Sequence, residues 1–393
     1  MLVLKKIMWP YYAITLVLLI AILMWGLLGI FGGGGYGYRL FSFYAIIPTM
    51  LFTMGCILGF KDAYIKWLYP VLFGFITRMA VLQFVNLQVG LTFLPFLFAF
   101  SGMVVGTMAR IVFQKLSINM QLKLKKFAQV VFVIGSIIAL IHIVHAVTLD
   151  RIIEYKEVSF SSQNIPIELS GYRIAFIADT HSIPAIRLRG IVEELNNRDV
   201  DLLILGGDFP SEDGAEWRSM EILSQTITTD GIFGVEGNHD NYADLFEAKK
   251  AHGIVPLSNS GVLVRDNFFL AGVEDLWNRN PNIAVAIENS SPDDFILLVS
   301  HNPDVSMQQD TTGVDLILSG HTHGGQITFF GIWAPYFTFG NTITDYGQRF
   351  VSGWAESQDG IPVFVSRGTG EYIPRIFAIP QVILLTLGHV PTN

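Results

Sequence analysis

The stretch ILSGHTHGGQI, residues 317–327, places two histidines one residue apart directly after an apolar run. Aspartate, asparagine and histidine also follow other short apolar runs in the second half of the chain. These side chains are common oxygen and nitrogen ligands of divalent metals, and histidine also transfers protons in catalysis. Five runs end in this way: 172–179, 201–208, 231–240, 294–301 and 314–323.

The runs themselves have the length and the β-branched content of buried strands. Segments 186–198 and 216–225, which lie between them, have the apolar spacing of helices. Strands that alternate with helices form βαβ units, whose ligand sites gather at the carboxyl ends of the strands. A helix cap or a turn would explain any one of the polar ends. Five in succession instead predict a shared site.

The polar ends supply enough ligands for two metal ions. A structural zinc site needs four ligands, usually with cysteines, and the single cysteine, Cys56, lies in a distant apolar run. Mixed oxygen and nitrogen ligands favour Mn, Fe, Zn or Co over Ca or Mg. Asp208 is the natural bridge, because a carboxylate can bind two ions, which would produce a hydroxide from a bridging water near neutral pH. The seven candidate ligands are Asp179, His181, Asp208, Asn238, His301, His321 and His323.

The ordered motifs resemble the calcineurin-like metallophosphoesterase superfamily over about residues 180–375. The ending Gly-His-Thr-His-Gly-Gly-Gln, which closes at Gln326, is similar to a bacterial membrane-associated branch that includes lipid-directed and UDP-diacylglucosamine-type hydrolases. The resemblance implies a four-layer α/β/β/α sandwich with two mixed sheets. The motifs that carry it are Asp179-Thr-His181, Gly207-Asp208, Gly237-Asn238-His239-Asp240, His301 and Gly320-His321-Thr-His323.

The resemblance also implies a role for each residue. One ion would bind Asp179, His181, Asp208 and His323, and the other would bind Asp208, Asn238, His301 and His321. His239 would face the phosphoryl oxygen or act as general acid on the leaving group, with Asp240 holding its imidazole. Asn238 and His239 would also contact the substrate.

Arginines near the C-terminus are further candidates for substrate binding. Arg375, which we predict as a substrate-binding residue, and Arg367 lie in an otherwise acidic half of the chain. Either could bind a phosphate. Either could equally form an internal ion pair, with Glu371 or another acid. The segment WNRNPN, residues 277–282, allows the same two interpretations.

The first part of the chain has the composition of a membrane region. The whole chain is 51% hydrophobic with a mean hydropathy of +0.47. A bilayer-spanning helix needs about 20 apolar residues. The distribution of Lys and Arg between the loops predicts a cytoplasmic N-terminus and an extracytoplasmic second half. We therefore predict a multi-pass transmembrane region at 1–149 and an extracytoplasmic metallophosphoesterase domain at 150–393. The five predicted spans are roughly 9–32, 40–60, 67–86, 88–109 and 127–148.

The charge of the two halves of the chain indicates which binding partners to expect. Residues 1–150 carry 11 Lys and Arg against 2 acids, whereas residues 151–393 carry 14 against 31. An acidic domain without a basic patch argues against a nucleic-acid partner. A tether to the lipid bilayer favours a lipid-linked or envelope-associated phosphate ester. The sequence thus predicts a dinuclear-metal phosphoesterase that acts on a phosphomonoester or phosphodiester.

Other functions would use the same residues. A nucleotidase, a cyclic-nucleotide phosphodiesterase or a phosphoprotein phosphatase would need the same metal centre. A membrane sensor or transporter could bind metal or phosphate without turnover, and it would have no use for His239. A separate channel function of the membrane region would depend on Arg78, His142 and His145.

Overall fold

The computed structural model describes residues 152–391 with short gaps, and few residues before them. The chain divides into two compact units, Met1–Thr148 and Leu149–Asn393. No helix among the described residues is long and apolar enough to cross a bilayer. The five predicted spans lie outside the described residues, apart from isolated positions of the last one. The described residues are 116–123, 126, 127, 130, 133, 137, 152–181, 183–209, 215–326, 328, 330–334, 337, 343–370, 375 and 377–391.

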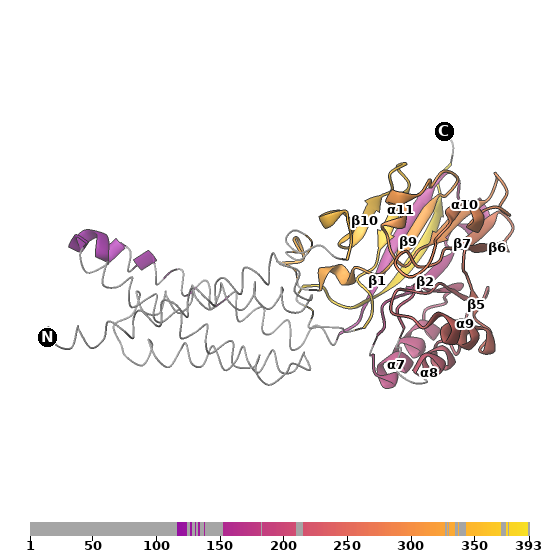
Figure 1. The fold of residues 1–393 in the computed structure, drawn as a ribbon, viewed down its shortest axis with the longest axis horizontal. Helices are drawn as coiled ribbons and strands as arrows, with labels where there is room; N and C mark the ends of the chain where they lie inside the picture. The colour runs from indigo at the N-terminus through magenta and orange to yellow at the C-terminus, as the bar shows by residue number, and fades with distance from the viewer. Residues whose placement is uncertain are drawn as a thin grey trace. The chain divides into compact units, whose positions relative to one another are not determined.

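The first sheet of the second unit has six strands in the order β1-β12-β2-β3-β4-β5 (Figure 1). Strand β12 runs antiparallel to β2, and all other neighbours in this sheet are parallel. The sheet is therefore mixed. Its strands are β1 (Glu154–Ser162), β12 (Gln381–His389), β2 (Arg173–Ile177), β3 (Leu202–Leu205), β4 (Ile232–Gly234) and β5 (Val255–Pro256).

The second sheet is also mixed and has six strands in the order β10-β11-β9-β8-β7-β6. Its two outer pairs, β10 with β11 and β6 with β7, are antiparallel. The inner pairs are parallel. Its strands are β10 (Gly353–Glu356), β11 (Pro362–Val365), β9 (Leu316–Ser319), β8 (Phe295–Val299), β7 (Phe268–Gly272) and β6 (Ser260–Arg265).

The helices predicted at 186–198 and 216–225 occur as α7 and α8, with ends shifted by one or two residues. Helix α7 begins directly after Pro184, whose fixed φ suits the entry to a helix. The described α-helices are α7 (Ala185–Asn196), α8 (Ala215–Leu223), α9 (Tyr242–Ala251), α10 (Ile283–Ala286) and α11 (Val305–Gln308). The described 3-10 helices are η4 (Ile167–Leu169), η5 (His323–Gly325) and η6 (Gly347–Phe350).

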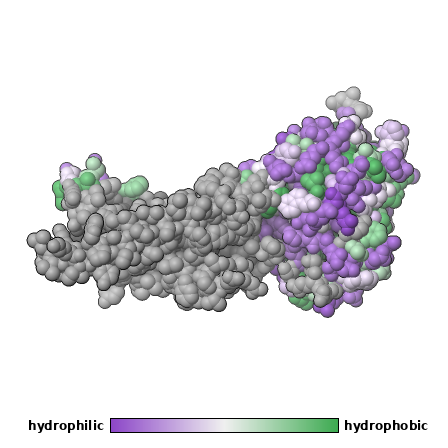
Figure 2. All heavy atoms as spheres, viewed as in Figure 1, coloured by the Kyte–Doolittle hydropathy of each residue, from purple (hydrophilic) through white to green (hydrophobic). Residues whose placement is uncertain are grey.

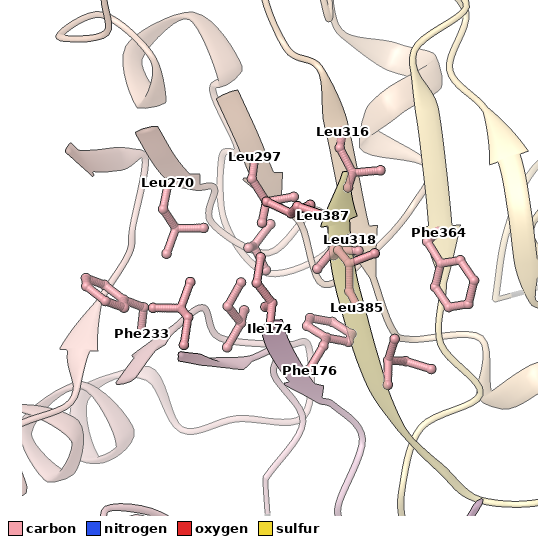
Figure 3. Close-up of a cluster of buried hydrophobic side chains, with 14 of the residues drawn as sticks. Ile174, Phe176, Phe233, Leu270, Leu297, Leu316, Leu318, Phe364, Leu385 and Leu387 are labelled. Atoms are coloured by element: carbon pink, nitrogen blue, oxygen red, sulfur yellow. The ribbon is translucent and has the colours of Figure 1, made fainter. Parts of the chain in front are cut away.

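The alternation of side chains along each strand builds the layers. In β2, Ile174 and Phe176 point between the two sheets, as Figure 3 shows, whereas Ala175 and Ile177 pack with α7, α8 and α9. Each such side chain contributes about 1.5–3 kcal/mol when fully buried. The outer face of the second sheet packs against Ile283 of α10 among others. The described residues therefore confirm the predicted α/β domain with two mixed sheets, which pack face to face.

Candidate metal centre

The loops after β2, β3, β8 and β9 bring six of the seven predicted ligands together. The side chains form two overlapping groups, and within each group the ligand atoms lie within 4.8 Å of one another. All six residues are buried. Asp208 belongs to both groups, as expected of a shared ligand. The first group is Asp179, His181, Asp208 and His323, and the second is Asp208, His301 and His321.

Distances within the first group match those of ligands on one ion. Nε2 of His181 lies 2.9 Å from Nε2 of His323 and 3.6 Å from Oδ2 of Asp208. Nε2 of His323 is 3.5 Å from Oδ1 of Asp179. Ligand atoms about 2.1 Å from an ion and at right angles to each other lie about 3 Å apart. The four side chains are therefore spaced to share a cation.

The second group has two imidazoles whose proton positions are fixed by backbone carbonyls. Nδ1 of His301 is 2.7 Å from the oxygen of Gly206, and Nε2 of His321 is 2.9 Å from the oxygen of Ile343. A carbonyl only accepts, so these nitrogens donate, and the opposite nitrogen of each ring is the one that a metal could bind. Nε2 of His301 lies 3.3 Å from Oδ2 of Asp208. Each ring thus retains one nitrogen for a metal.

Two buried atoms of predicted ligands meet no hydrogen-bond geometry among the described residues, although one of them, Nε2 of His301, lies in ion-pair distance of Asp208. They are Nε2 of His301 and Oδ1 of Asn238, the seventh predicted ligand. A buried polar atom without a partner costs about 1–3 kcal/mol. Both atoms belong to the predicted second metal site. The donor set therefore fits a cation at this position.

The backbone around the ligands is strained. Non-glycine residues at positive φ are uncommon, and each costs about 1–3 kcal/mol. The amide of His321 donates to both oxygens of Asp179, at 3.0 and 3.1 Å, which helps to hold this conformation. Strain of this kind collects at functional sites. The ligands with positive φ are Asp179 (53°), His181 (39°), Asp208 (59°), His321 (70°) and His323 (52°).

Two motif glycines allow the loops to approach the carboxylates. A Cβ atom on Gly237 would lie 2.2 Å from Oδ1 of Asp208. One on Gly320 would lie 2.6 Å from Oδ2 of Asp179. Both distances are below van der Waals contact, so only glycine fits at either position while the carboxylates stay in place.

The buried carboxylates and His301 control one another's ionisation. Burial raises the pKa of Asp179 to about 7, and His301 opposes this rise. Burial alone would also raise the pKa of Asp208, but His301 and His181 hold it well below its usual range. Burial alone would lower the pKa of His301, whereas Asp208 and Asp179 raise it to about 10. A bound cation would replace this proton as the balancing charge, so metal binding releases protons.

The other imidazoles of the cluster are neutral at neutral pH. Burial lowers the pKa of His181 to about 4 and that of His321 to about 3. Burial also holds the pKa of His323 well below its usual range. Neutral imidazoles have the lone pair that a metal ligand requires.

The expected role of Asp240 needs correction. Its Oδ2 accepts from the backbone N–H groups of Asp208, at 2.9 Å, and Gly237, at 2.7 Å. Its Oδ1 accepts from the N–H of Phe209, at 2.7 Å. Both oxygens are thus committed to the backbone of the loops after β3 and β4. Asp240 fixes the loop that carries Asp208, whereas we had expected it to orient the imidazole of His239.

His239 lies at the edge of the cluster. It is exposed, and its ring stands edge-on to that of His181 with 5.3 Å between centroids. Its backbone N–H donates to Oδ1 of Asp208, at 2.8 Å. This position lets the imidazole meet a ligand that enters from solvent.

The predicted substrate-binding role of Arg375 is wrong. This residue is fully buried at 0% exposure, and its guanidinium donates to the carbonyls of Gly370, at 2.6 and 3.0 Å, and Arg367, at 2.6 Å. Nη2 also lies 3.3 Å from Nδ1 of His323. A guanidinium enclosed by carbonyls supports the loop behind His323 and is out of reach of a substrate phosphate. The alternative partner, Glu371, lies outside the described residues.

Arg367 forms an internal ion pair, which is one of the two roles that the sequence left open for it. Its Nη2 pairs with Glu154 at the start of β1. Its Nε donates to Oε1 of Gln381, the first residue of β12, at 3.0 Å. Arg367 therefore joins two neighbouring strands through an internal ion pair.

Replacing Arg375 with alanine is expected to lower the free energy of unfolding by about 3 kcal/mol or more, because several buried carbonyls would lose their donors. Thermal and urea unfolding of the full chain in detergent would measure this loss. The exposed Arg349 is the control, and Arg349→Ala should change the stability by less than about 0.5 kcal/mol. Unchanged stability together with a raised KM in Arg375→Ala would restore the substrate-binding role.

The loop after β7 also lines the site, although none of its residues was predicted from the sequence as a site residue. The ring of Trp277, 48% exposed, stands edge-on to that of His321 with 4.5 Å between centroids. Nδ2 of Asn278 donates to the carbonyl of Asn238, at 2.6 Å. The first two residues of 277–282 therefore contact two of the predicted metal ligands, His321 and Asn238. A signal existed, because the apolar run 268–273 also ends in acids, Glu274 and Asp275.

The two packed sheets hold a buried cluster of aspartates and histidines at the ends of their strands, and this set of side chains suits divalent metals. Residues 172–325 also match the family model of calcineurin-like phosphoesterases. Residues 172–325 are therefore a calcineurin-like phosphoesterase region, as the motifs predicted.

Relatives with this domain occur in vertebrates and bacteria. A Danio rerio protein named transmembrane protein with metallophosphoesterase domain is 27% identical over 75% of this chain and 70% of its own length. An uncharacterized metallophosphoesterase of Helicobacter pylori is 29% identical over 49% of this chain and 52% of its own. Phosphodiesterase YaeI of Escherichia coli is 29% identical over 55% of this chain and 82% of its own. The chain thus spans only about half the length of the Helicobacter relative.

Proposed function

We propose that this protein hydrolyses a phosphomonoester or phosphodiester with two divalent ions held by the seven predicted ligands. The observation that carries the proposal is the pair of overlapping ligand groups that share Asp208. Oδ1 of Asn238, the remaining predicted ligand, is buried and has no hydrogen-bond partner among the described residues. A polar atom in a purely structural cluster would have such a partner.

The ligands divide between the two ions according to the two observed groups. Asp179, His181, Asp208 and His323 would hold the first ion, and Asp208, His301 and His321 would hold the second. Asn238 would be the fourth ligand of the second ion, as the sequence predicts. Their mixed oxygen and nitrogen donors favour Mn, Fe, Zn or Co. When bound, such ions polarise the phosphoryl group and lower the pKa of water to near neutral.

The protein's own side chains perform the remaining steps. The imidazole of His239 donates a proton to the leaving oxygen, because it is exposed to solvent at the edge of the cluster. Asp240 keeps the loop of Asp208 in place through its three backbone hydrogen bonds. Asn238 and His239 contact the phosphoryl oxygens, and Trp277 forms a wall of the site beside His321.

A lipid-linked or envelope-associated ester is the proposed substrate class. The five predicted spans support it, since they would tether the domain to a bilayer outside the cytoplasm. Two relatives, from Danio rerio and Bos taurus, are also named transmembrane proteins with a metallophosphoesterase domain. The acidic charge of the domain argues against a nucleic-acid partner.

Removal of metal is expected to abolish hydrolysis of bis-p-nitrophenyl phosphate and p-nitrophenyl phosphate by the full chain in detergent. Mn, Fe, Zn or Co should restore it more fully than Ca, because the ligand set includes four imidazoles. The diester-to-monoester ratio then directs the search for the substrate, with nucleotides in the same panel. A chain that binds two ions and hydrolyses none of these esters would instead support a sensor without turnover.

A further inference from the structure

An uncharged aromatic segment follows the ligand His323. Residues 324–344 contain no Asp, Glu, Lys or Arg and include six aromatic residues, in a half of the chain with 31 acids. Among its described side chains, Ile332 is 86% exposed and Phe330 is 41% exposed. The described surface in Figure 2 is mainly hydrophilic, so apolar side chains exposed to this degree need an explanation.

The exposed tip of this segment has a fixed structure. The ring of Phe330 packs against that of Phe377, with 5.2 Å between centroids. The hydroxyl of Thr328 donates to the carbonyl of Phe377, at 3.2 Å, and accepts from the N–H of Gly331, at 3.0 Å. Phe330 and Phe377 both have a φ of 54°, which is rare for a bulky residue. The fold thus keeps Phe330 exposed, with the half-buried Phe377 beneath it, at a conformational cost. We call Phe330, Ile332 and Phe377 the apolar tip.

The apolar tip is connected directly to the metal centre. Its segment begins right after His323 and returns to the site at Ile343, whose carbonyl accepts from Nε2 of His321, at 2.9 Å. The tip therefore lies on the side of the domain where the carboxyl ends of the strands meet. A surface that docks there would be close to the metal ligands.

The chain enters the domain on the same side. The N–H of Glu154, the first residue of β1, donates to the carbonyl of Pro380, at 2.8 Å, and Phe377 lies three residues before Pro380. The last predicted span ends at residue 148. Five residues lie between that span and β1, and they reach at most about 18 Å when extended. If the span crosses a bilayer, the start of β1 lies within about 18 Å of the bilayer surface.

We propose that the apolar tip inserts into the lipid bilayer and holds the metal centre at the level of the lipid phosphates. Aromatic and aliphatic side chains on an uncharged loop suit the membrane interface, and the short tether brings that interface to them. The inference rests on the proposed phosphoesterase function and deepens it. The substrate would be a phosphate ester of a lipid, taken directly from the bilayer.

Insertion is measured without catalysis, so it is tested independently of the phosphoesterase function. The full chain carrying Cys56→Ser and Ile332→Cys would be labelled with an environment-sensitive fluorophore. It would then be reconstituted into phosphatidylethanolamine–phosphatidylglycerol vesicles with and without doxyl-labelled lipids. The matched control is Ile227→Cys, since Ile227 is 72% exposed and precedes β4, at the amino ends of the strands.

Insertion predicts a blue-shifted emission at position 332 and quenching by doxyl lipids at least several-fold stronger than at position 227. Equal, water-like emission at both positions would overturn the proposal. A blue shift at 332 without lipid quenching would also overturn it, because it would show that protein covers the tip.

A kinetic comparison tests the consequence for the substrate. In the same vesicles, Ile332→Glu should lower the ratio of the hydrolysis rate of hexadecyl p-nitrophenyl phosphate to that of soluble bis-p-nitrophenyl phosphate by about tenfold, since a charge at the tip opposes insertion. Ile227→Glu should leave the ratio unchanged. An equal ratio in the two variants would contradict direct uptake from the bilayer.

Discussion

Replacing Asp208 with asparagine is expected to lower metal-dependent hydrolysis by about a thousandfold or more. Asp208 is the one side chain that belongs to both ligand groups, so the substitution removes negative charge from both proposed ions. Losing several kcal/mol of transition-state stabilisation from metals corresponds to about three orders of magnitude. The amide oxygen of asparagine can still accept the N–H of His239, so the local backbone should be retained.

The loss at Asp208 would be measured as kcat/KM for bis-p-nitrophenyl phosphate, together with the metal content of each purified variant. Asp199→Asn is a matched control. Asp199 is exposed, and its φ of 50° is close to the 59° of Asp208, so the same change is made in a similar backbone conformation away from the cluster. Turnover within a few-fold of the parent protein in Asp208→Asn would rule out a shared catalytic ligand at this position.

Replacing His239 with alanine is expected to lower turnover by about a hundredfold to ten-thousandfold, which is the range for loss of a general acid. The loss should depend on the leaving group. An alkoxide needs a proton as it departs, whereas p-nitrophenolate is stable without one. Alkyl phosphate esters should therefore suffer a larger loss than p-nitrophenyl esters, and both would be measured as kcat with saturating metal.

The control for His239 is His252→Ala at the end of α9, where the imidazole contacts the ring of Trp217. That substitution should leave both classes of ester unaffected. An equal loss for alkyl and p-nitrophenyl esters in His239→Ala would indicate that His239 positions the substrate. Retention of full activity toward both would remove His239 from the mechanism.

The candidate metal ligands could be predicted because each of them closely follows an apolar run in the sequence. Each apolar run is long enough to be a buried strand, and parallel strands place their carboxyl ends together whatever their order. Asp179 and Asp208, which follow neighbouring strands of one sheet, could therefore be grouped without knowledge of the loops, whereas His301 follows a strand of the other sheet. The shared position of Asp208 followed in the same way, since a carboxylate is the one ligand type in this set that readily bridges two ions.

The roles of Asp240, Arg375 and Trp277 depend on contacts that no local pattern records. A guanidinium binds phosphate and backbone carbonyls with the same donors, so the type of residue does not distinguish a substrate contact from the carbonyl cluster around Arg375. Asp240 likewise accepts from any nearby N–H. Trp277 reaches His321 because β7 lies beside β8, and strand order is set by the packing of the whole sheet.

The position of β12 in the sheet could not be predicted from the sequence either. This C-terminal strand lies between β1 and β2, parallel to the first and antiparallel to the second. Its apolar sequence indicates a buried strand but carries no information on its neighbours. The five membrane spans stay predictions, because they fall on residues outside the described part of the chain.

The dinuclear centre is tested most directly by anomalous diffraction from crystals of the full chain grown with Mn²⁺. The ligand assignment predicts two anomalous peaks, both in contact with Asp208, one beside His181 and the other beside His301. A single peak, or two peaks without Asp208 between them, would contradict it.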